Sequence, residues 1–264
     1  MRRHEYVFST ESDLGLRQVR TLELLLDGAT EEILAPIGPS PGARCLEAGA
    51  GGGSIARLLA ERAGPHGEVV AVDTDTKWLD GLPGVQVHTH DINEGLPVAG
   101  PYDLIHARLL LMHLGRRREI LRMLVDALAP GGWLVTGDFG DRSRQVLAAP
   151  SAADAELFER VQDIGQRHVL PLVGMDMGWA AEADGEMAAA GLVDLDGLAY
   201  RPTAAGGSPG ALLHHNHTLQ MEPLLLKAGI TTEELTRYRA LMADPRFRAW
   251  FFEFVCHRGR KPAA

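Results

Sequence analysis

The sequence of 264 residues predicts an α/β fold, in which helices cover both faces of a sheet. The strongest indication is a glycine cluster, 49–53, between an apolar run that ends at Leu46 and a helical pattern that begins at Ile55. Two further apolar runs, 67–73 and 85–91, follow at the spacing of alternating strands and helices. Each of these runs ends in an aspartate. A chain of this length can bury the core of one such domain together with extra helices.

The glycine cluster predicts a tight turn at the start of a helix, and two classes of nucleotide-like ligand compete for it. Gly51, Gly53 and Ala56 have the G-x-G-x-x-A spacing of dinucleotide-binding folds. Glu47 and Gly49, with the same two glycines, have a different pattern, acidic-x-Gly-x-Gly-x-Gly, which resembles motif I of the class I S-adenosylmethionine-dependent methyltransferases. A carboxylate at this point would repel a pyrophosphate. S-adenosylmethionine has no phosphate and carries a positive ammonium and a positive sulfonium, so Glu47 favours this second ligand.

The later elements are consistent with an adenosine-binding sheet. Asp73 ends the second predicted strand, where an acid can receive both hydroxyls of a ribose. Asp91 ends the third predicted strand and is followed by the apolar Ile92. The segment 102–108 predicts a fourth strand, and the sequence Leu-Ala-Pro-Gly-Gly-Trp-Leu-Val at 128–135 predicts a turn into a fifth.

These elements, in this order over residues 43–139, resemble the class I S-adenosylmethionine-dependent methyltransferases. The Ala107-Arg108 pair and the Leu-Ala-Pro-Gly-Gly turn are similar to the ubiquinone/menaquinone-biosynthesis-like group. The resemblance implies a Rossmann-like seven-stranded sheet with a helical cap and lid, and S-adenosyl-L-methionine as the cofactor. It also implies methylation of an O, N or C atom of a small-molecule acceptor, such as a secondary metabolite. The cofactor-binding residues that it implies are Tyr6, Glu47, Gly49, Gly51, Gly53, Asp73, Thr74, Asp91, Ile92, Ala107 and Arg108.

Histidines are the candidate catalytic residues. Methyl transfer from a sulfonium is an in-line displacement, so the main requirement is to hold acceptor and methyl group aligned in a dry site. A hydroxyl or carbon acceptor also needs a base, and histidine titrates in the useful range. His113, about one turn beyond the fourth strand, is the first candidate, with packing of the next helix as its alternative role. His215 and His217, in a later histidine-rich segment, are the second, and no metal site is predicted there because a clear third ligand is missing.

Composition divides the chain into three predicted ranges. Residues 1–40 form a helical cap, 41–145 the cofactor-binding core, and 146–264 the lid helices and the strands six and seven that complete the same domain. Helices are predicted over 14–25, 31–34, 151–169, 179–190, 211–228 and 231–242, and the last two strands over 192–200 and 250–256.

Charge and composition argue against other classes of partner. With 26 basic and 35 acidic residues the net charge is −9, which disfavours a nucleic-acid partner, and Arg116–Arg118 is interpreted as a solvated helix face. No apolar run approaches the roughly 20 residues that span a bilayer, so no membrane partner is predicted. Cys45 and Cys256 form no C-x-x-C pair, and the strand order of the resembled family places them too far apart for a disulfide. We therefore expect a cytoplasmic protein. A homodimer is the oligomer that we expect.

Two alternatives stay open at this point. One is a nicotinamide-dependent oxidoreductase, which the spacing of Gly51, Gly53 and Ala56 supports. The other is a protein that keeps the methyltransferase fold and cofactor but has a non-methylating role in cyclisation or binding.

Overall fold

The computed structural model describes residues 13–142 and 145–263. The chain folds into two compact units, and each unit combines several segments. The first unit consists of Met1–Leu25, Asp141–Met177 and Tyr200–Glu253, and the second of Leu26–Gly140, Gly178–Ala199 and Phe254–Ala264. Each unit draws on all three of the ranges predicted from the sequence, and that three-part division stays a prediction.

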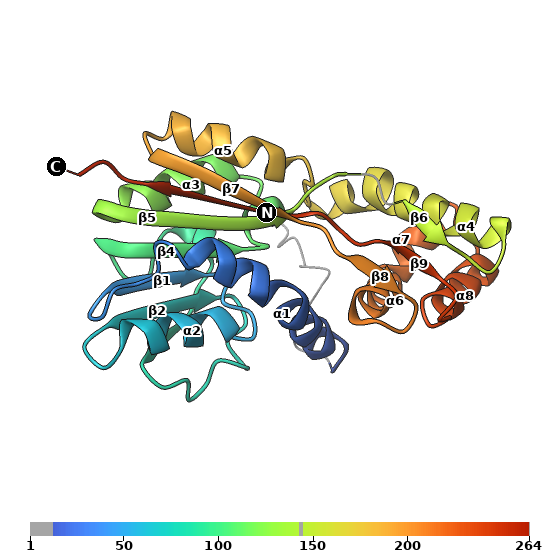
Figure 1. Cartoon of the computed structure of the whole chain (residues 1–264), viewed down its shortest axis with the longest axis horizontal. Coiled ribbons are helices and arrows are strands. Elements are labelled where there is room, and N and C mark those ends of the chain that lie inside the picture. The colour runs from blue at the N-terminus through green and yellow to red at the C-terminus, as the bar shows by residue number, and fades with distance from the viewer. Residues whose placement is uncertain (1–12, 143–144, 264) are drawn as a thin grey trace. The chain divides into compact units, whose positions relative to one another are not determined.

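The second unit contains a seven-stranded sheet with the strand order β3-β2-β1-β4-β5-β10-β7 (Figure 1). Strands β1 to β5 pair in parallel, whereas β10 runs antiparallel to β5. The bounds are β1 (Arg44–Ala48), β2 (Glu68–Asp73), β3 (Val85–Thr89), β4 (Tyr102–Arg108), β5 (Leu128–Phe139), β7 (Val193–Tyr200) and β10 (Phe254–Arg260). The predicted α/β class with seven strands is confirmed. Because the chain order reverses between β1 and β4, their carboxyl ends form the switch point where open α/β sheets bind ligands.

Helices cover this sheet and explain why its central strands are apolar runs. Helix α2 (Ser54–Ala63) packs on β1, β2 and β3, and helices α3 (Arg117–Asp126) and α5 (Trp179–Ala189) pack on β5. Strand β2 is buried along 69–72, as expected for a parallel strand covered on both faces. The same helical spacing that predicted α2 places its buried residues, Ile55, Ala56 and Leu59, on one face.

The N-terminal helix α1 (Asp13–Leu34) is a single helix where the sequence predicted two. Its last part belongs to the second unit, where Leu26, Ala29 and Ile33 are buried at helical spacing. Burial of this continuous apolar face outweighs the cost of about 1 kcal/mol for Gly28 in the helix interior.

The first unit contains a small sheet of order β6-β9-β8 and a group of helices. Its strands are β6 (Val146–Ala148), β8 (Thr203–Ala205) and β9 (Arg248–Trp250), and its helices are α4 (Ala152–Ile164), α6 (Pro209–Gln220), α7 (Glu222–Lys227) and α8 (Thr232–Leu241). Helix α4 continues as a π turn, η3 (Gly165–Val169), and a 3₁₀ turn, η4 (Leu170–Val173). In the part of the chain that the structure describes, no helix is both long and apolar enough to cross a membrane.

Two predicted elements of the C-terminal range are wrong in their extent. The predicted helix 211–228 is divided into α6 and α7, because Pro223 cannot donate an N–H to the preceding turn. The predicted strand 250–256 is also divided, since Trp250 ends β9 in the small sheet and Phe254 begins β10 in the large one. The apolar run 250–256 therefore contributes its first residue to the small sheet and its last three residues to the large sheet.

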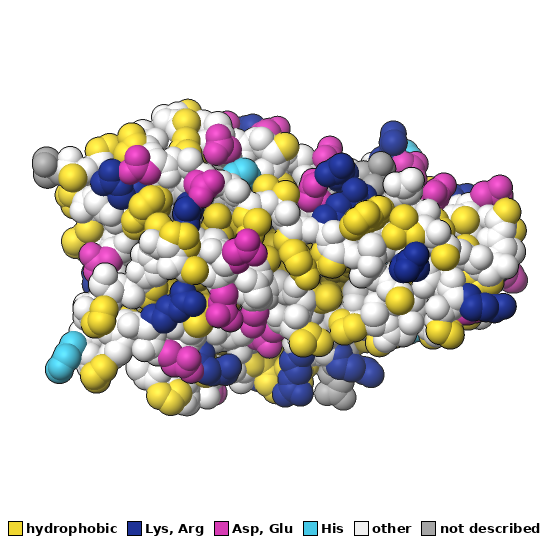
Figure 2. Space-filling view, viewed as in Figure 1, with side chains coloured by type: hydrophobic (Ala, Val, Ile, Leu, Met, Phe, Trp, Pro, Cys, Tyr) yellow, Lys and Arg dark blue, Asp and Glu magenta, His cyan; other side chains and the backbone are white. Residues whose placement is uncertain are grey.

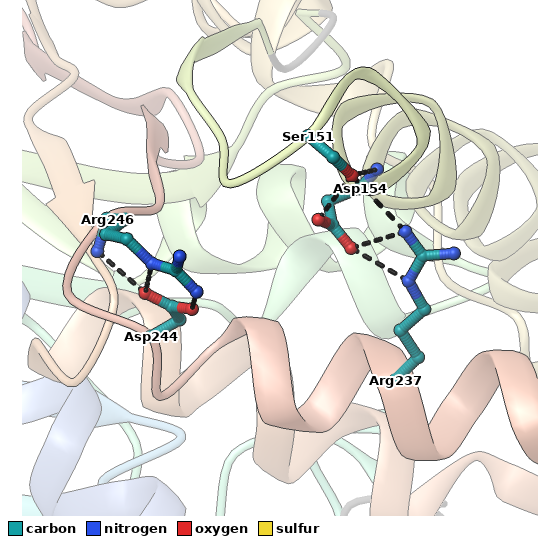
Figure 3. A network of polar contacts seen from close by, with 5 residues as sticks. All are labelled: Ser151, Asp154, Arg237, Asp244 and Arg246. Atoms are coloured by element: carbon teal, nitrogen blue, oxygen red, sulfur yellow. Dashed lines mark hydrogen bonds and ion pairs between the residues drawn. The ribbon is translucent and has the colours of Figure 1, made fainter.

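Polar contacts in the first unit hold the start of α4 against α8 (Figure 3). Arg237 Nε donates to Asp154 Oδ1 at 2.8 Å, and the Ser151 hydroxyl donates to Asp154 Oδ2 at 2.6 Å. The Ser151 hydrogen bond and the Arg237 charge lower the pKa of Asp154. Asp244 and Arg246 form a second pair in the turn before β9, with 2.6 Å between Asp244 Oδ2 and Arg246 Nη2.

Candidate functional site

The glycine loop, residues 49–53, follows the carboxyl end of β1 at the switch point. Gly49, Gly51 and Gly53 have φ values of 74°, 53° and 83°, a region that favours glycine. A Cβ on Gly53 would lie 2.7 Å from Leu82 Cδ1, so a side chain does not fit there. The loop leads into α2, whose first backbone N–H groups have no partner within the helix.

Asp73 connects the end of β2 to the glycine loop. Its Oδ2 accepts a hydrogen bond from Gly51 N–H at 2.8 Å, and its Oδ1 accepts one from Asp75 N–H at 3.1 Å. Burial raises the pKa of Asp73, and these N–H groups oppose that shift. The structure thus brings together the acid and the glycine that the sequence assigned to one cofactor.

Glu47 and His106 form a buried pair on adjacent strands. They are register partners on β1 and β4, with 2.7 Å between Glu47 Oε2 and His106 Nδ1 and side chains that are only 3% and 1% exposed. Glu47 therefore already has a polar partner inside the sheet. Its predicted role at the amino-acid end of the cofactor is untested by this contact and stays a prediction.

Arg108 leaves the end of β4 toward α1 and α2. Its Nη1 donates to Asp27 Oδ1 at 2.8 Å and to Thr30 Oγ1 at 3.1 Å. The Ser54 hydroxyl donates to the same Asp27 oxygen at 3.0 Å. This network joins α1 to the start of α2, next to the glycine loop, while the preceding residue Ala107 is buried in the strand.

The remaining predicted cofactor residues of the second unit lie at the ends of β2 and β3. Thr74 is exposed directly after β2, and Asp73 O accepts a hydrogen bond from His90 N–H at 2.9 Å, which joins the two strand ends. Asp91 is exposed and caps the 3₁₀ turn η1 (Ile92–Glu94), whose first residue, Ile92, is buried. Tyr6 lies outside the described residues.

His113 ends the 3₁₀ turn η2 (Leu111–His113), which follows β4. Burial, and then the positive charge of Arg117, lower the pKa of His113 to about 4. The imidazole is therefore neutral at pH 7 and has low basicity.

His215 and His217 lie on α6, in the first unit, so the structure places them in a different unit from His113. Burial and the charge of Arg239 lower the pKa of His215. The His217 ring lies 6.0 Å from the ring of Phe252. Within 13–142 and 145–263, no group of three or more His, Cys, Asp or Glu residues could hold a metal ion.

Sequence reasoning missed two functional candidates in the second unit and misread a third residue. Asp138, on β5, is 2% exposed, and burial raises its pKa to about 8. Asp27 had no motif to mark it, because its partner Arg108 is distant in sequence. Arg117 belongs to the run interpreted as a solvated face, yet its Nε donates to Leu111 O at 3.2 Å. The signal that the sequence offered for Asp138 is an acid within an apolar strand, after Gly137 and near the carboxyl end of that strand.

Comparisons with known proteins agree with this geometry. A family described as "Methyltransferase domain" matches residues 19–184. "Methyltransferase str2" of Strobilurus tenacellus is 35% identical over 107 residues, which are 40% of this chain and 38% of that protein. A "Trans-aconitate 2-methyltransferase" of Variovorax paradoxus is 32% identical over 108 residues, 39% of this chain and 41% of that protein. The chain thus matches about two fifths of the length of these relatives.

A solved structure, a putative methyltransferase of Bacillus halodurans, has a TM-score of 0.57 at 18% identity. The superposition covers 89% of this chain and 100% of that protein. At this identity the likeness concerns the fold alone.

Proposed function

Because the chain belongs to the methyltransferase-domain family, we propose that it transfers a methyl group from S-adenosyl-L-methionine to a small-molecule acceptor. The observation that carries the proposal is the contact between Asp73 and Gly51 at the switch point. It joins the acid that we assign to the ribose to a glycine loop that also has an acid, Glu47, two residues before its first glycine, and Glu47 is held there by His106. An acid in that place suits a cationic ligand better than a pyrophosphate.

The residues present fit this cofactor. The positive φ values of Gly49, Gly51 and Gly53 hold the loop in a tight turn that leads to the first N–H groups of α2, which have no partner within the helix. We assign the ribose to Asp73, the adenine to Asp91 and Ile92, and the amino-acid end to the surroundings of Glu47. When bound, S-adenosylmethionine supplies an activated methyl group, so the chain has to hold the acceptor in line with it and exclude water.

The proposal of a small-molecule acceptor is supported by the similarity to a trans-aconitate methyltransferase and by charge. The net charge is −9, and on the face that Figure 2 shows, basic side chains are interspersed with acidic ones. A surface that binds nucleic acid has a concentration of positive charge instead. An acceptor from secondary metabolism, a homodimer and a cytoplasmic location are further parts of this proposal.

For an acceptor that must lose a proton, we propose His113 as the base, with His215 or His217 as second choice. His113 follows β4, one of the two strands of the switch point, in the same unit as the glycine loop. Its low pKa keeps it unprotonated at pH 7. That state is necessary for a general base.

Two assays test the function. Calorimetry with S-adenosylhomocysteine should give saturable binding, and NAD should give none at the same concentration. Incubation of the protein with S-adenosylmethionine and a metabolite pool should then yield products that are one methylene heavier by mass spectrometry. Tight binding of NAD instead would favour the oxidoreductase. If the protein binds the methyl donor and converts a metabolite to a product that has gained no methyl group, the cyclisation role would be favoured.

A further inference from the structure

The segment Leu109–His113, here called the β4 loop, begins with a backbone conformation that is rare outside glycine. Leu109 has a φ of 50°. Its N–H donates to Gly137 O of β5 at 2.7 Å, directly after the last register pair of β4 and β5, Arg108 and Gly137. A strained residue of this kind persists when its surroundings hold it, and such residues are concentrated at functional sites.

The side chain of Asp138 holds the same loop. Asp138 Oδ1 accepts a long hydrogen bond from Met112 N–H at 3.4 Å, and the N–H of Leu110 also acts on the carboxyl group. Burial is the largest influence on this group and raises its pKa to about 8. Near pH 7 the protonated carboxyl group therefore predominates, and its carbonyl oxygen is still an acceptor.

Arg117 of α3 holds the loop through its backbone carbonyl groups. Its Nε donates to Leu111 O at 3.2 Å and its Nη2 to Met112 O at 3.5 Å. Asp138 thus accepts hydrogen bonds from N–H groups of the loop, and Arg117 donates hydrogen bonds to its carbonyl groups. Both residues come from elements on the β5 side of the loop.

On its other side, the β4 loop touches the glycine loop. A Cβ built on Gly49 would lie 3.2 Å from Leu110 Cδ1 and 3.3 Å from Leu110 Cβ. Leu110 therefore packs against the backbone of the first glycine, whose N–H also donates to Val72 O at 2.8 Å. A displacement of the β4 loop would remove the packing contact from Leu110.

We propose, on the basis of the methyl transfer proposed above, that Asp138 is a positioning residue that holds the β4 loop so that Leu110 orders the glycine loop for the methyl donor. Asp138 acts through Leu110 and Gly49 and does not itself touch the donor. The charged or titratable groups that face it are Arg117 from α3 and Cys256 from β10, and the indole of Trp179 from α5 lies beside it.

The first test compares substitutions of Asp138 by calorimetry with S-adenosylhomocysteine. Asp138→Ala should weaken binding about tenfold, because buried N–H groups lose their acceptor. Asp138→Asn keeps an acceptor oxygen and should stay within about threefold of the parent. Asp103→Ala is the matched control. It removes a β4 carboxylate that also accepts one backbone N–H, from Arg44 at 2.8 Å, but near the opposite end of the strand, and it should leave affinity unchanged.

A double-mutant cycle separates positioning from a general loss of structure. If Asp138 acts through Leu110, then Asp138→Ala should weaken binding less than about threefold in the Leu110→Ala background. Additive losses, or an Asp138→Ala protein that is folded and binds like the parent, would overturn the inference. Absence of donor binding by the parent protein would instead refute the proposed function.

Amide hydrogen exchange gives an independent measurement should Asp138→Ala not fold. In the parent protein, S-adenosylhomocysteine should slow exchange in 109–113 as well as in 49–53, because coupling between two sites is reciprocal. Slowing in 49–53 alone would overturn the inference. In the absence of ligand, Asp138→Asn should retain the parent's exchange in both segments, and faster exchange in 109–113 would contradict the role of the acceptor oxygen.

Discussion

Glu47 and His106 lie on neighbouring central strands with 2.7 Å between Oε2 and Nδ1, and the two side chains are almost completely buried. The acid that marks the glycine motif in the sequence is therefore part of a polar pair inside the sheet. A buried carboxylate needs such a partner, since burial without one is strongly unfavourable. The pair links the first strand of the cofactor site to the fourth.

Removal of the histidine should destabilise the protein. His106→Leu leaves the Glu47 carboxyl group buried without its partner, so we expect the free energy of unfolding to fall by about 3–5 kcal/mol in urea denaturation. Exposed His66 provides the control, and His66→Leu should change stability by less than about 0.5 kcal/mol. A loss below about 1 kcal/mol for His106→Leu would mean that the pair is not needed for folding.

Asp73 should control donor affinity through both the ribose and the glycine loop. Asp73→Ala removes the acceptor of Gly51 N–H, and we expect the affinity for S-adenosylhomocysteine to fall by at least about 1.5 kcal/mol, roughly tenfold. Asp80→Ala, an exposed acid shortly after β2, should bind like the parent in the same calorimetric titration. Equal affinities for the parent and Asp73→Ala would contradict the assignment of the ribose.

Both cysteines should be free and unreactive in the folded protein. Strands β4 and β5 separate Cys45 on β1 from Cys256 on β10, a distance of about 14 Å at the usual strand spacing, and a disulfide requires less than about 7 Å between Cα atoms. Burial raises the pKa of each thiol to about 12, so the nucleophilic thiolate is scarce at pH 8. A thiol reagent should react slowly before unfolding and should count two groups afterwards. A count of zero in unreduced, unfolded monomer would be incompatible with this strand order.

The pH dependence of turnover should identify the base. His113→Ala should reduce turnover by at least about 10² while donor affinity stays within a few-fold, if the acceptor must lose a proton. Because burial lowers the pKa of His113 to about 4, turnover of the parent should fall only as the pH approaches 4. A decrease centred near the ordinary histidine value of 6.5 would point to another base, and His215→Ala and His217→Ala would then be measured in the same way.

Local patterns in the sequence determined the α/β class, the glycine loop and the five parallel strands, because side-chain periodicity and turn chemistry operate over a few residues. They also located Asp73 at a strand end and Gly53 where a side chain does not fit. The same local reasoning was wrong at 250–254, where one apolar run contains the end of β9 and the start of β10, which belong to different sheets. Nothing within a short window distinguishes one long strand from two short ones.

Only the tertiary structure decided which polar groups meet. Glu47 and His106 are 59 residues apart, Asp138 and Met112 are 26 apart, and Arg108 and Asp27 are 81 apart. Each pair depends on the strand order that places β4 between β1 and β5, or on the packing of α1 near the end of β4. The burial that sets the pKa of Asp138 and His113 has the same origin, because it results from the assembly of distant segments around each side chain.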